Sequence, residues 1–88
     1  MNYTVVLTRE PDGRYDVEVP ALKGCHTFGD SLPEALQMAE RAILLFTESL
    51  RGRGLPMPPD RPDVRVSTRD SAEVLVYRVA VREVELAA

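Results

Sequence analysis

The spacing of apolar residues changes twice along this chain, and that change limits the folds it can adopt. Between residues 32 and 52 apolar side chains recur every three or four positions, which matches one face of an α-helix. Before and after this stretch they recur at every second position, which matches β-strands. The helical stripe consists of Leu32, Ala35, Leu36, Ala39, Ala42, Ile43, Phe46 and Leu50. The pattern therefore predicts one long helix set among strands.

Three short strands are predicted before the helix. The first covers residues 2–9 and is followed by residues 10–14, whose Pro and Gly favour a tight hairpin turn. The second covers residues 15–19, with apolar side chains on one face and carboxylates on the other. A third is expected over residues 25–28. Strands that follow one another through short turns favour an antiparallel sheet.

The ends of the helix carry recognisable signals. Ser31 can cap the first turn, and Glu34, three positions later, can complete a capping box. Gly52 and Gly54 are expected to end the helix, because glycine is common just past a helix C-terminus. We therefore predict a helix over residues 32–52.

The C-terminal part contains a connector and a further strand. Residues 55–63 are rich in proline, which predicts an extended, stiff connector. Residues 64–66 have the composition of a short strand. Residues 72–86 alternate again, so we predict a C-terminal strand there, with a bulge or strand end near residues 82–83 where the alternation slips.

This order of elements predicts the fold class. A β-β-β-α-β chain buries both of its apolar stripes when one helix packs over one face of a small sheet. We therefore expect an α+β protein with two layers: a small, mainly antiparallel sheet and one long helix on one face. Its 88 residues fit a single domain, residues 1–88.

Charge and composition exclude several classes of function. Fourteen acidic and eleven basic residues give a net charge of −3, which disfavours direct binding of nucleic acid. No apolar run is long enough to span a membrane, and the N-terminus lacks the features of a signal peptide. The single cysteine excludes a multi-cysteine metal cage. We expect a cytoplasmic protein without a cofactor or a metal.

Two groups of residues invite a catalytic interpretation. Cys25 and His26 are neighbours on a predicted strand, so their side chains point to opposite faces and do not form a nucleophile and base. The carboxylates of Asp16, Glu18 and Glu73 are the kind of group that binds metal ions for phosphodiester hydrolysis. Because they alternate with apolar residues, we expect them on a solvated face and predict no enzyme active site.

Surplus apolar residues point to self-association. Met38 and Leu45 widen the apolar stripe of the helix, and Leu44 is expected apart from it on the polar side. Val74 and Val76 add a second apolar face to the last strand, although a two-layer fold leaves one sheet face wet. We therefore name Met38, Leu45, Val74 and Val76 as candidates for an interface between copies of the chain.

Several short motifs between Tyr15 and Pro59 occur together in a fixed order. They are Pro20-Ala21-Leu22, Gly24-Cys25, Gly29-Asp30-Ser31, Glu34-Ala35, Ser49-Leu50 and Gly54-Leu55-Pro56. In this respect the sequence resembles the HicB-like antitoxin family of bacterial and archaeal HicA–HicB toxin–antitoxin pairs. The chain departs from the family in having Lys23 where a second proline is common.

The resemblance implies a partial RNase H-like fold without that enzyme's catalytic carboxylates. It also implies a partner, a small basic HicA-like toxin that cleaves mRNA, and assembly into homodimers or homotetramers. Gly29, Asp30, Ser31 and Glu34 would then form a structural turn and helix cap. Many family members add a C-terminal DNA-binding module, for which we expect no room before Ala88.

The leading hypothesis is therefore a non-catalytic antitoxin domain that binds and neutralises such a toxin. The alternative is an orphan domain that associates with itself, has no toxin partner and binds an unknown ligand. A residual metal-dependent nuclease is a third hypothesis, and it requires hydrolysis that depends on Asp16 or Glu18.

Overall fold

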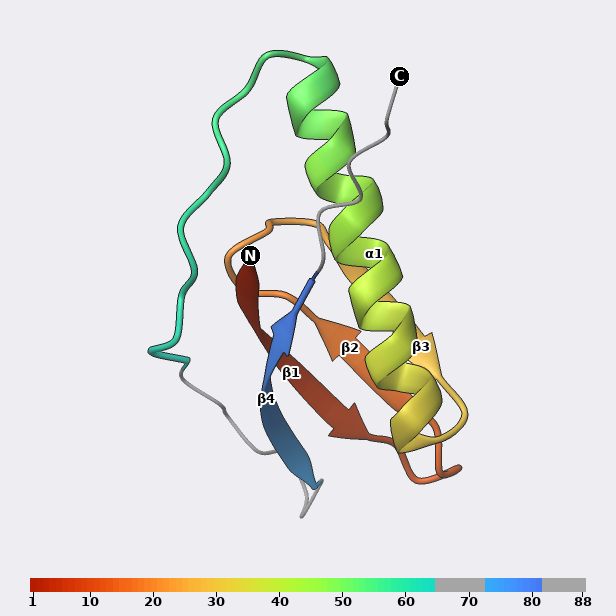
Figure 1. Cartoon of the computed structure of the whole chain (residues 1–88). Helices are drawn as coiled ribbons and strands as arrows, with labels where there is room; N and C mark the ends of the chain where they lie inside the picture. Colours follow the sequence, from red (N-terminus) through yellow and green to blue (C-terminus); the bar gives the residue numbers. More distant parts are fainter. Residues whose placement is uncertain (65–72, 82–88) are drawn as a thin grey trace.

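The computed structural model describes residues 1–64 and 73–81 (Figure 1). Its elements are β1 (Asn2–Arg9), β2 (Tyr15–Glu18), β3 (His26–Gly29), α1 (Leu32–Gly52) and β4 (Val74–Ala80). The described part has one sheet and one helix in the order β-β-β-α-β, which confirms the predicted α+β class. The predicted strand over residues 64–66 is not present at residue 64, and the rest of it lies outside the described residues. Of the strand predicted over residues 72–86, residues 72 and 82–86 also lie outside them, as does the predicted slip at residues 82–83.

The four strands form an antiparallel sheet in the order β3-β2-β1-β4. β1 is central and pairs with β4 over seven residues, from Asn2 opposite Ala80 to Thr8 opposite Val74. The β1–β2 turn is closed by the Glu10 N–H, which donates to Arg14 O at 2.7 Å. The N-terminal half of the chain thus builds three strands, and β4 joins them from the far end of the sequence.

α1 lies across one face of this sheet, which we call the helix face (Figure 1). The opposite face, which carries no helix in the described part of the chain, is the open face. The core between helix and sheet is formed by Tyr3, Val5, Leu7, Val17, Val19, Leu22, Cys25, Ala35, Ala39, Ile43 and Val81. Side chains on the open face come from the even-numbered residues of the four strands, because cross-strand partners share a face.

Small residues let α1 approach the sheet closely. Ala35 and Ala39 are fully buried, and a Cβ on Gly29 would lie 2.6 Å from the Ala35 Cα. The backbone of β3 therefore touches the first turns of the helix. Gly29 is the last residue of β3, directly before the residues where the chain turns into α1, and the lack of a side chain permits this close contact.

Both helix ends are capped. The Glu34 N–H donates to Ser31 Oγ at 3.3 Å, which confirms Ser31 as the N-cap. At the other end the Leu55 N–H donates to Leu50 O and the Gly54 N–H donates to Arg51 O, the pattern of a Schellman motif. Gly54 supplies the positive φ of 69° that this motif needs. Gly54 thus ends the helix, whereas Gly52, which was also expected to do so, lies within it.

The connector after α1 is held against β1. The Tyr3 hydroxyl donates to Pro58 O at 2.6 Å, and the Thr4 N–H and hydroxyl donate to Asp60 Oδ1 and Oδ2 at 2.7 and 2.9 Å. The Thr4 N–H faces the side on which β2 has already ended at Glu18. Asp60 therefore takes the place of a missing strand partner.

The side of α1 that packs against the sheet differs from the prediction at two positions. Leu44, expected on the polar side, is half-buried and packs against the core. Thr47 was not predicted inside, yet it is buried, and its hydroxyl donates to Ile43 O at 2.8 Å. Leu44 and Thr47 lie on the same flank of the buried Ile43, so the sheet covers more of that flank than the apolar stripe indicates.

Candidate interaction surfaces

The four self-association candidates do not form one surface. Leu45 is 68% exposed and points away from the sheet, on the side of α1 opposite the buried Ile43. Met38, seven residues earlier, lies on the same side and is half-buried. Val74 and Val76 are on the open face, where Val76 is 53% exposed. The helix pair and the strand pair thus lie on opposite sides of the two layers.

Cys25 and His26 are separated as expected. The Cys25 thiol is buried in the core, and burial raises its pKa, which keeps it protonated. His26 is exposed on the open face, opposite Glu18 in the sheet. The two side chains therefore cannot act as a nucleophile and its base.

The carboxylates considered for metal binding are not brought together either. Asp16 and Glu18 are exposed on the open face of β2. Glu73 instead lies at the start of β4, where Oε2 is 3.5 Å from the Arg9 guanidinium. Within residues 1–64 and 73–81, no three His, Cys, Asp or Glu side chains gather closely enough to hold a metal ion.

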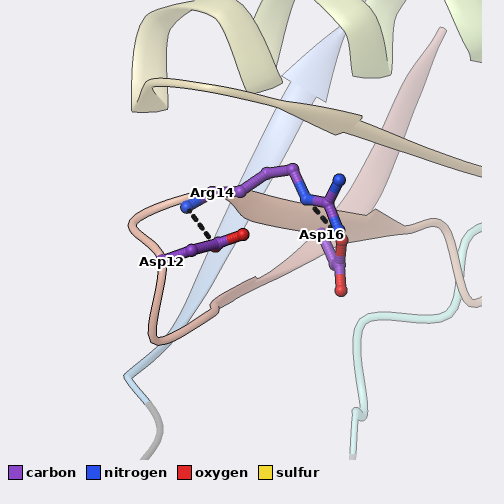
Figure 2. Close-up of polar contacts among 3 residues, drawn as sticks. All are labelled: Asp12, Arg14 and Asp16. Atoms are coloured by element: carbon purple, nitrogen blue, oxygen red, sulfur yellow. Dashed lines mark hydrogen bonds and ion pairs between the residues drawn. The ribbon is translucent and has the colours of Figure 1, made fainter.

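Acidic residues do gather on the open face beside the β1–β2 turn. The set, which we call the acidic patch, comprises Glu10, Asp12, Asp16 and Glu18. Figure 2 shows Arg14 between two of them: its backbone N–H donates to Asp12 Oδ1 at 3.0 Å, and its side-chain Nε is 4.0 Å from Asp16 Oδ1. A hydrogen bond with Asp16 raises the pKa of Glu10, with smaller contributions from burial and from the charge of Asp16.

Phe28 lies beside the acidic patch, on the neighbouring strand β3. It is 52% exposed and stands opposite Asp16 in the sheet, and the Arg14 guanidinium lies over its ring at 5.1 Å from the centroid. Sequence reasoning did not single out Phe28. The signal was its even position on β3, which places it on the same face as Asp16.

β4 forms a second exposed region. Within the described residues it has a neighbouring strand on one side only, and α1 lies mainly over β2 and β3 (Figure 1). As a result, Tyr77 on the helix face is 37% exposed, and Leu75 and Val79 are only half-buried. Val76 is exposed on the other face. The predicted apolar surplus on both faces of this strand is therefore present at its surface.

Comparison with known proteins identifies the family. The sequence model of the HicB-like antitoxin of bacterial toxin–antitoxin systems matches residues 3–87. The chain belongs to the HicB-like antitoxin family.

Two relatives are named UPF0150 proteins. The one from Synechocystis sp. is 48% identical over 59 residues, 67% of this HicB-like chain and 75% of the relative. The one from Thermoplasma acidophilum is 43% identical over 63 residues, 72% and 91% of the two chains.

Solved structures confirm the fold of this HicB-like chain. A chain of a HicA3 and HicB3 toxin–antitoxin complex matches with a TM-score of 0.72 and 22% identity, over 94% of this chain and 100% of that one. A toxin–antitoxin complex from Streptococcus pneumoniae matches with a TM-score of 0.69 and 16% identity, over 97% and 75%. The N-terminal domain of the Burkholderia pseudomallei antitoxin HicB matches with a TM-score of 0.60 and 20% identity, over 92% and 100%.

α1, with 21 residues the longest element in the described part, is too polar to cross a membrane.

Proposed function

We propose that this chain is a non-catalytic antitoxin that neutralises a small basic mRNA-cleaving toxin of the HicA type by binding it directly. Membership of the HicB-like family supports the antitoxin role, and two of the similar structures are toxin–antitoxin complexes. Because the toxin acts on mRNA, the proposal places both proteins in the cytoplasm.

The observation that carries the proposal is the acidic patch around Phe28. The region holds four carboxylates and one guanidinium, of which Asp16 lies 4.0 Å from the Arg14 Nε, so it has a negative excess on a chain of net charge −3. A protein that binds RNA must carry a positive surface to neutralise phosphates. The acidic patch is thus complementary to the surface that such a toxin uses for its substrate.

The patch combines two contributions to binding. Exposed charges speed association and select partners, but they contribute little affinity when they remain in solvent. Affinity comes mainly from a few large side chains that become buried at the centre of an interface. Phe28 is such a side chain, and its ring is already held in place by Arg14. We propose that Phe28 becomes buried at the centre of the interface with the toxin. Glu18 and Asp16 would then be the charged residues at the rim of that interface.

The proposal can be tested by isolating this chain, with any bound proteins, from the cells that produce it. The tagged chain is purified under native conditions, and co-purifying proteins are identified by mass spectrometry. We expect one small basic protein in stoichiometric amount. That protein alone should cleave RNA, and adding the antitoxin in equal amount should stop the cleavage. Recovery of only the bait's own oligomer would contradict the proposal and favour the orphan self-associating domain.

Matched variants test the surface. Glu18→Lys and Phe28→Ser each alter the acidic patch without removing a core residue, since both side chains are exposed. Glu48→Lys makes the same charge change on the exposed side of α1 and serves as the control. In titration calorimetry with the toxin we expect about tenfold or greater loss of affinity for each patch variant, equivalent to about 1.4 kcal/mol. Equal losses for Glu48→Lys and Glu18→Lys would show that the toxin does not distinguish the two surfaces.

A further inference from the structure

One arginine joins the β1–β2 turn to the exposed ring of Phe28. The guanidinium of Arg14 lies 5.1 Å from the centroid of the Phe28 ring, and its Nε is 4.0 Å from Asp16 Oδ1. The backbone of Arg14 is fixed as well, because its N–H donates to Asp12 Oδ1 at 3.0 Å and its carbonyl accepts from the Glu10 N–H at 2.7 Å. The side chain therefore starts from a closed turn and ends against a residue of the neighbouring strand β3.

Phe28 stands on the open face with more than half of its side chain exposed. The strand that carries it, β3, has four residues and lies at one end of the described sheet. An exposed side chain can occupy several staggered rotamers about χ1. A cation is attracted to the face of an aromatic ring, so a guanidinium held at that face restricts which rotamer is populated. The contact with Arg14 therefore favours one orientation of the ring.

A fixed ring favours binding through the dissociation rate. A side chain that becomes immobilised in an interface loses conformational entropy, and this loss weakens the complex. A ring that is already held in its bound orientation loses less entropy, so the complex is more stable. Affinity differences among variants of one interface appear mostly in the dissociation rate. Loss of the contact between Arg14 and Phe28 should thus accelerate dissociation.

The charge of Arg14 acts on the association rate instead. An acidic surface attracts a basic partner, and this attraction speeds association. Arg14 places a positive charge beside the carboxylates of the acidic patch and therefore weakens the attraction. The hydrogen bond with Asp16 is the main cause of the raised pKa of Glu10, and the charge of Arg14 acts against that rise. Replacing Arg14 by a neutral residue should thus accelerate association.

We infer that Arg14 is a positioning residue of the proposed toxin-binding surface: it holds the Phe28 ring in the orientation that the toxin buries, and it thereby slows dissociation of the complex. This inference rests on the proposed function. It adds a residue that charge alone would not select, since a cation repels a basic partner. Lysine should not replace Arg14. The planar guanidinium stacks on a ring while its Nε faces a carboxylate, whereas the lysine ammonium is a compact, strongly hydrated charge.

The first experiment measures the orientation of Phe28 in the isolated chain by NMR. The three-bond couplings between Hα and the two Hβ protons of Phe28 report whether χ1 occupies one rotamer or several. In the wild type we expect the values of a single rotamer, and in Arg14→Gln and Arg14→Lys we expect averaged values. Arg41→Gln is the control, because it makes the same change on the exposed side of α1 and should leave the couplings as in the wild type. Averaged couplings in the wild type, or unchanged couplings in Arg14→Gln, would overturn the inference.

The second experiment measures association and dissociation rates with the co-purified toxin by stopped-flow mixing. Arg14→Gln should dissociate about tenfold faster than the wild type. It should also associate faster at low salt, and the two association rates should converge as the salt concentration rises. Arg14→Lys keeps the charge, so it should associate like the wild type and still dissociate faster. A variant that merely loosened the β1–β2 turn would not associate faster.

A double-mutant cycle tests whether Arg14 acts through Phe28. Phe28→Leu keeps an apolar side chain but removes the ring on which the guanidinium stacks. In this background Arg14→Gln should still accelerate association but should no longer change the dissociation rate. Equally accelerated dissociation in both backgrounds, or no change in either, would overturn the inference and leave the proposed function standing. If no basic partner binds the chain, the proposed function fails and the inference fails with it.

Discussion

The two edges of the sheet, β3 and β4, are built in different ways. β3 has four residues and ends at Gly29, where its backbone meets the first turns of α1. β4 has seven residues, and its Leu75, Tyr77 and Val79 remain partly exposed on the same helix face. α1 therefore covers the helix face of β3 closely, whereas the apolar side chains of the longer β4 stay partly exposed on that face.

The difference shows that a single helix cannot cover a four-stranded sheet evenly. α1 is drawn over β2 and β3 because Gly29, Ala35 and Ala39 let the two backbones approach closely there. The surface that α1 leaves uncovered is on β4. Close packing at one edge thus produces exposure at the other.

The largest expected effect comes from a substitution at Gly29, where β3 meets the backbone of α1. Gly29→Ala places a Cβ 2.6 Å from the Ala35 Cα, and backbone on both sides cannot move away easily. Overpacking of this kind costs about 3 kcal/mol of the free energy of unfolding, or more. Chemical denaturation measures it. Gly52→Ala is the control, because nothing lies within 4 Å of its added Cβ and the residue is helical. It should be neutral or stabilising by up to about 1 kcal/mol; equal losses in both variants would refute the close-contact role of Gly29.

A smaller effect is expected where the connector holds β1. Asp60→Ala removes the acceptor for two hydrogen bonds from Thr4, one of them from a backbone N–H that β2 does not reach. Hydrogen bonds to a charged group contribute roughly 1.5–3 kcal/mol when buried, and Asp60 is only half-buried. We therefore expect a loss of about 1–2 kcal/mol by urea denaturation.

The contribution of Asp60 should also depend on pH. Burial acts to raise the pKa of Asp60, but the hydrogen bonds from Thr4 and Arg61 and the charge of Arg78 outweigh it, so the pKa is lowered from its ordinary value of 3.8. A group with a lowered folded pKa stabilises the protein above its unfolded pKa, and this stabilisation is lost as the pH falls through the folded pKa. The difference in unfolding free energy between wild type and Asp60→Asn should therefore be constant near neutral pH and shrink below about pH 4. A difference that stays unchanged in acid would show that the carboxylate charge is not what holds the connector.

Hydrogen exchange compares the two edges directly. The amides of His26 and Phe28 on β3 and of Val76 and Arg78 on β4 all point away from the sheet, by the alternation of each ladder. In dilute solution we expect all four to exchange rapidly, and the amides of Leu75 and Tyr77 to exchange slowly. Slow exchange at Val76 and Arg78, with rapid exchange at His26 and Phe28, would contradict the expectation that the outward amides of both edges are unpaired within the described residues.

The smallest effect is expected at the solvent-exposed start of β4. Arg9 and Glu73 form an ion pair at 3.5 Å in which both side chains are more than half exposed. Exposed pairs contribute at most about 1 kcal/mol and often nothing. Glu73→Ala should change the thermal unfolding midpoint by only about a degree or two. A loss of unfolding free energy as large as that of Asp60→Ala would contradict this expectation. It would mean that the ion pair between Arg9 and Glu73 contributes substantially to the attachment of β4.

Much of this arrangement was predictable from residue patterns. Alternation at every second residue marked the strands, and the Ser31 cap and the helical stripe placed α1 at the residues where it is found. The separation of Cys25 from His26 followed from strand geometry alone. These features depend on residues close together in the sequence, so local spacing is sufficient to predict them.

Other features depended on contacts between distant residues. Leu44 and Thr47 are inside because the sheet extends over that side of the helix, and no helical spacing indicates how wide the sheet is. Gly29 makes a close contact with the backbone of Ala35, which no pattern of neighbouring residues indicated. Phe28 and Asp16 become neighbours only through the register of β2 and β3.

By itself, the sequence determined the elements, their order and the apolar surplus of the last strand, because propensity and periodicity act over a few residues. Only the tertiary structure decided which strand lies at each edge, which side of α1 is buried, and that Leu45 and Val76 lie on opposite sides. The physical reason is that strand order and helix placement are chosen by packing over the whole chain. A Gly and two Ala residues set the closest approach of helix and sheet, and that approach determined which surface of the described residues remained exposed.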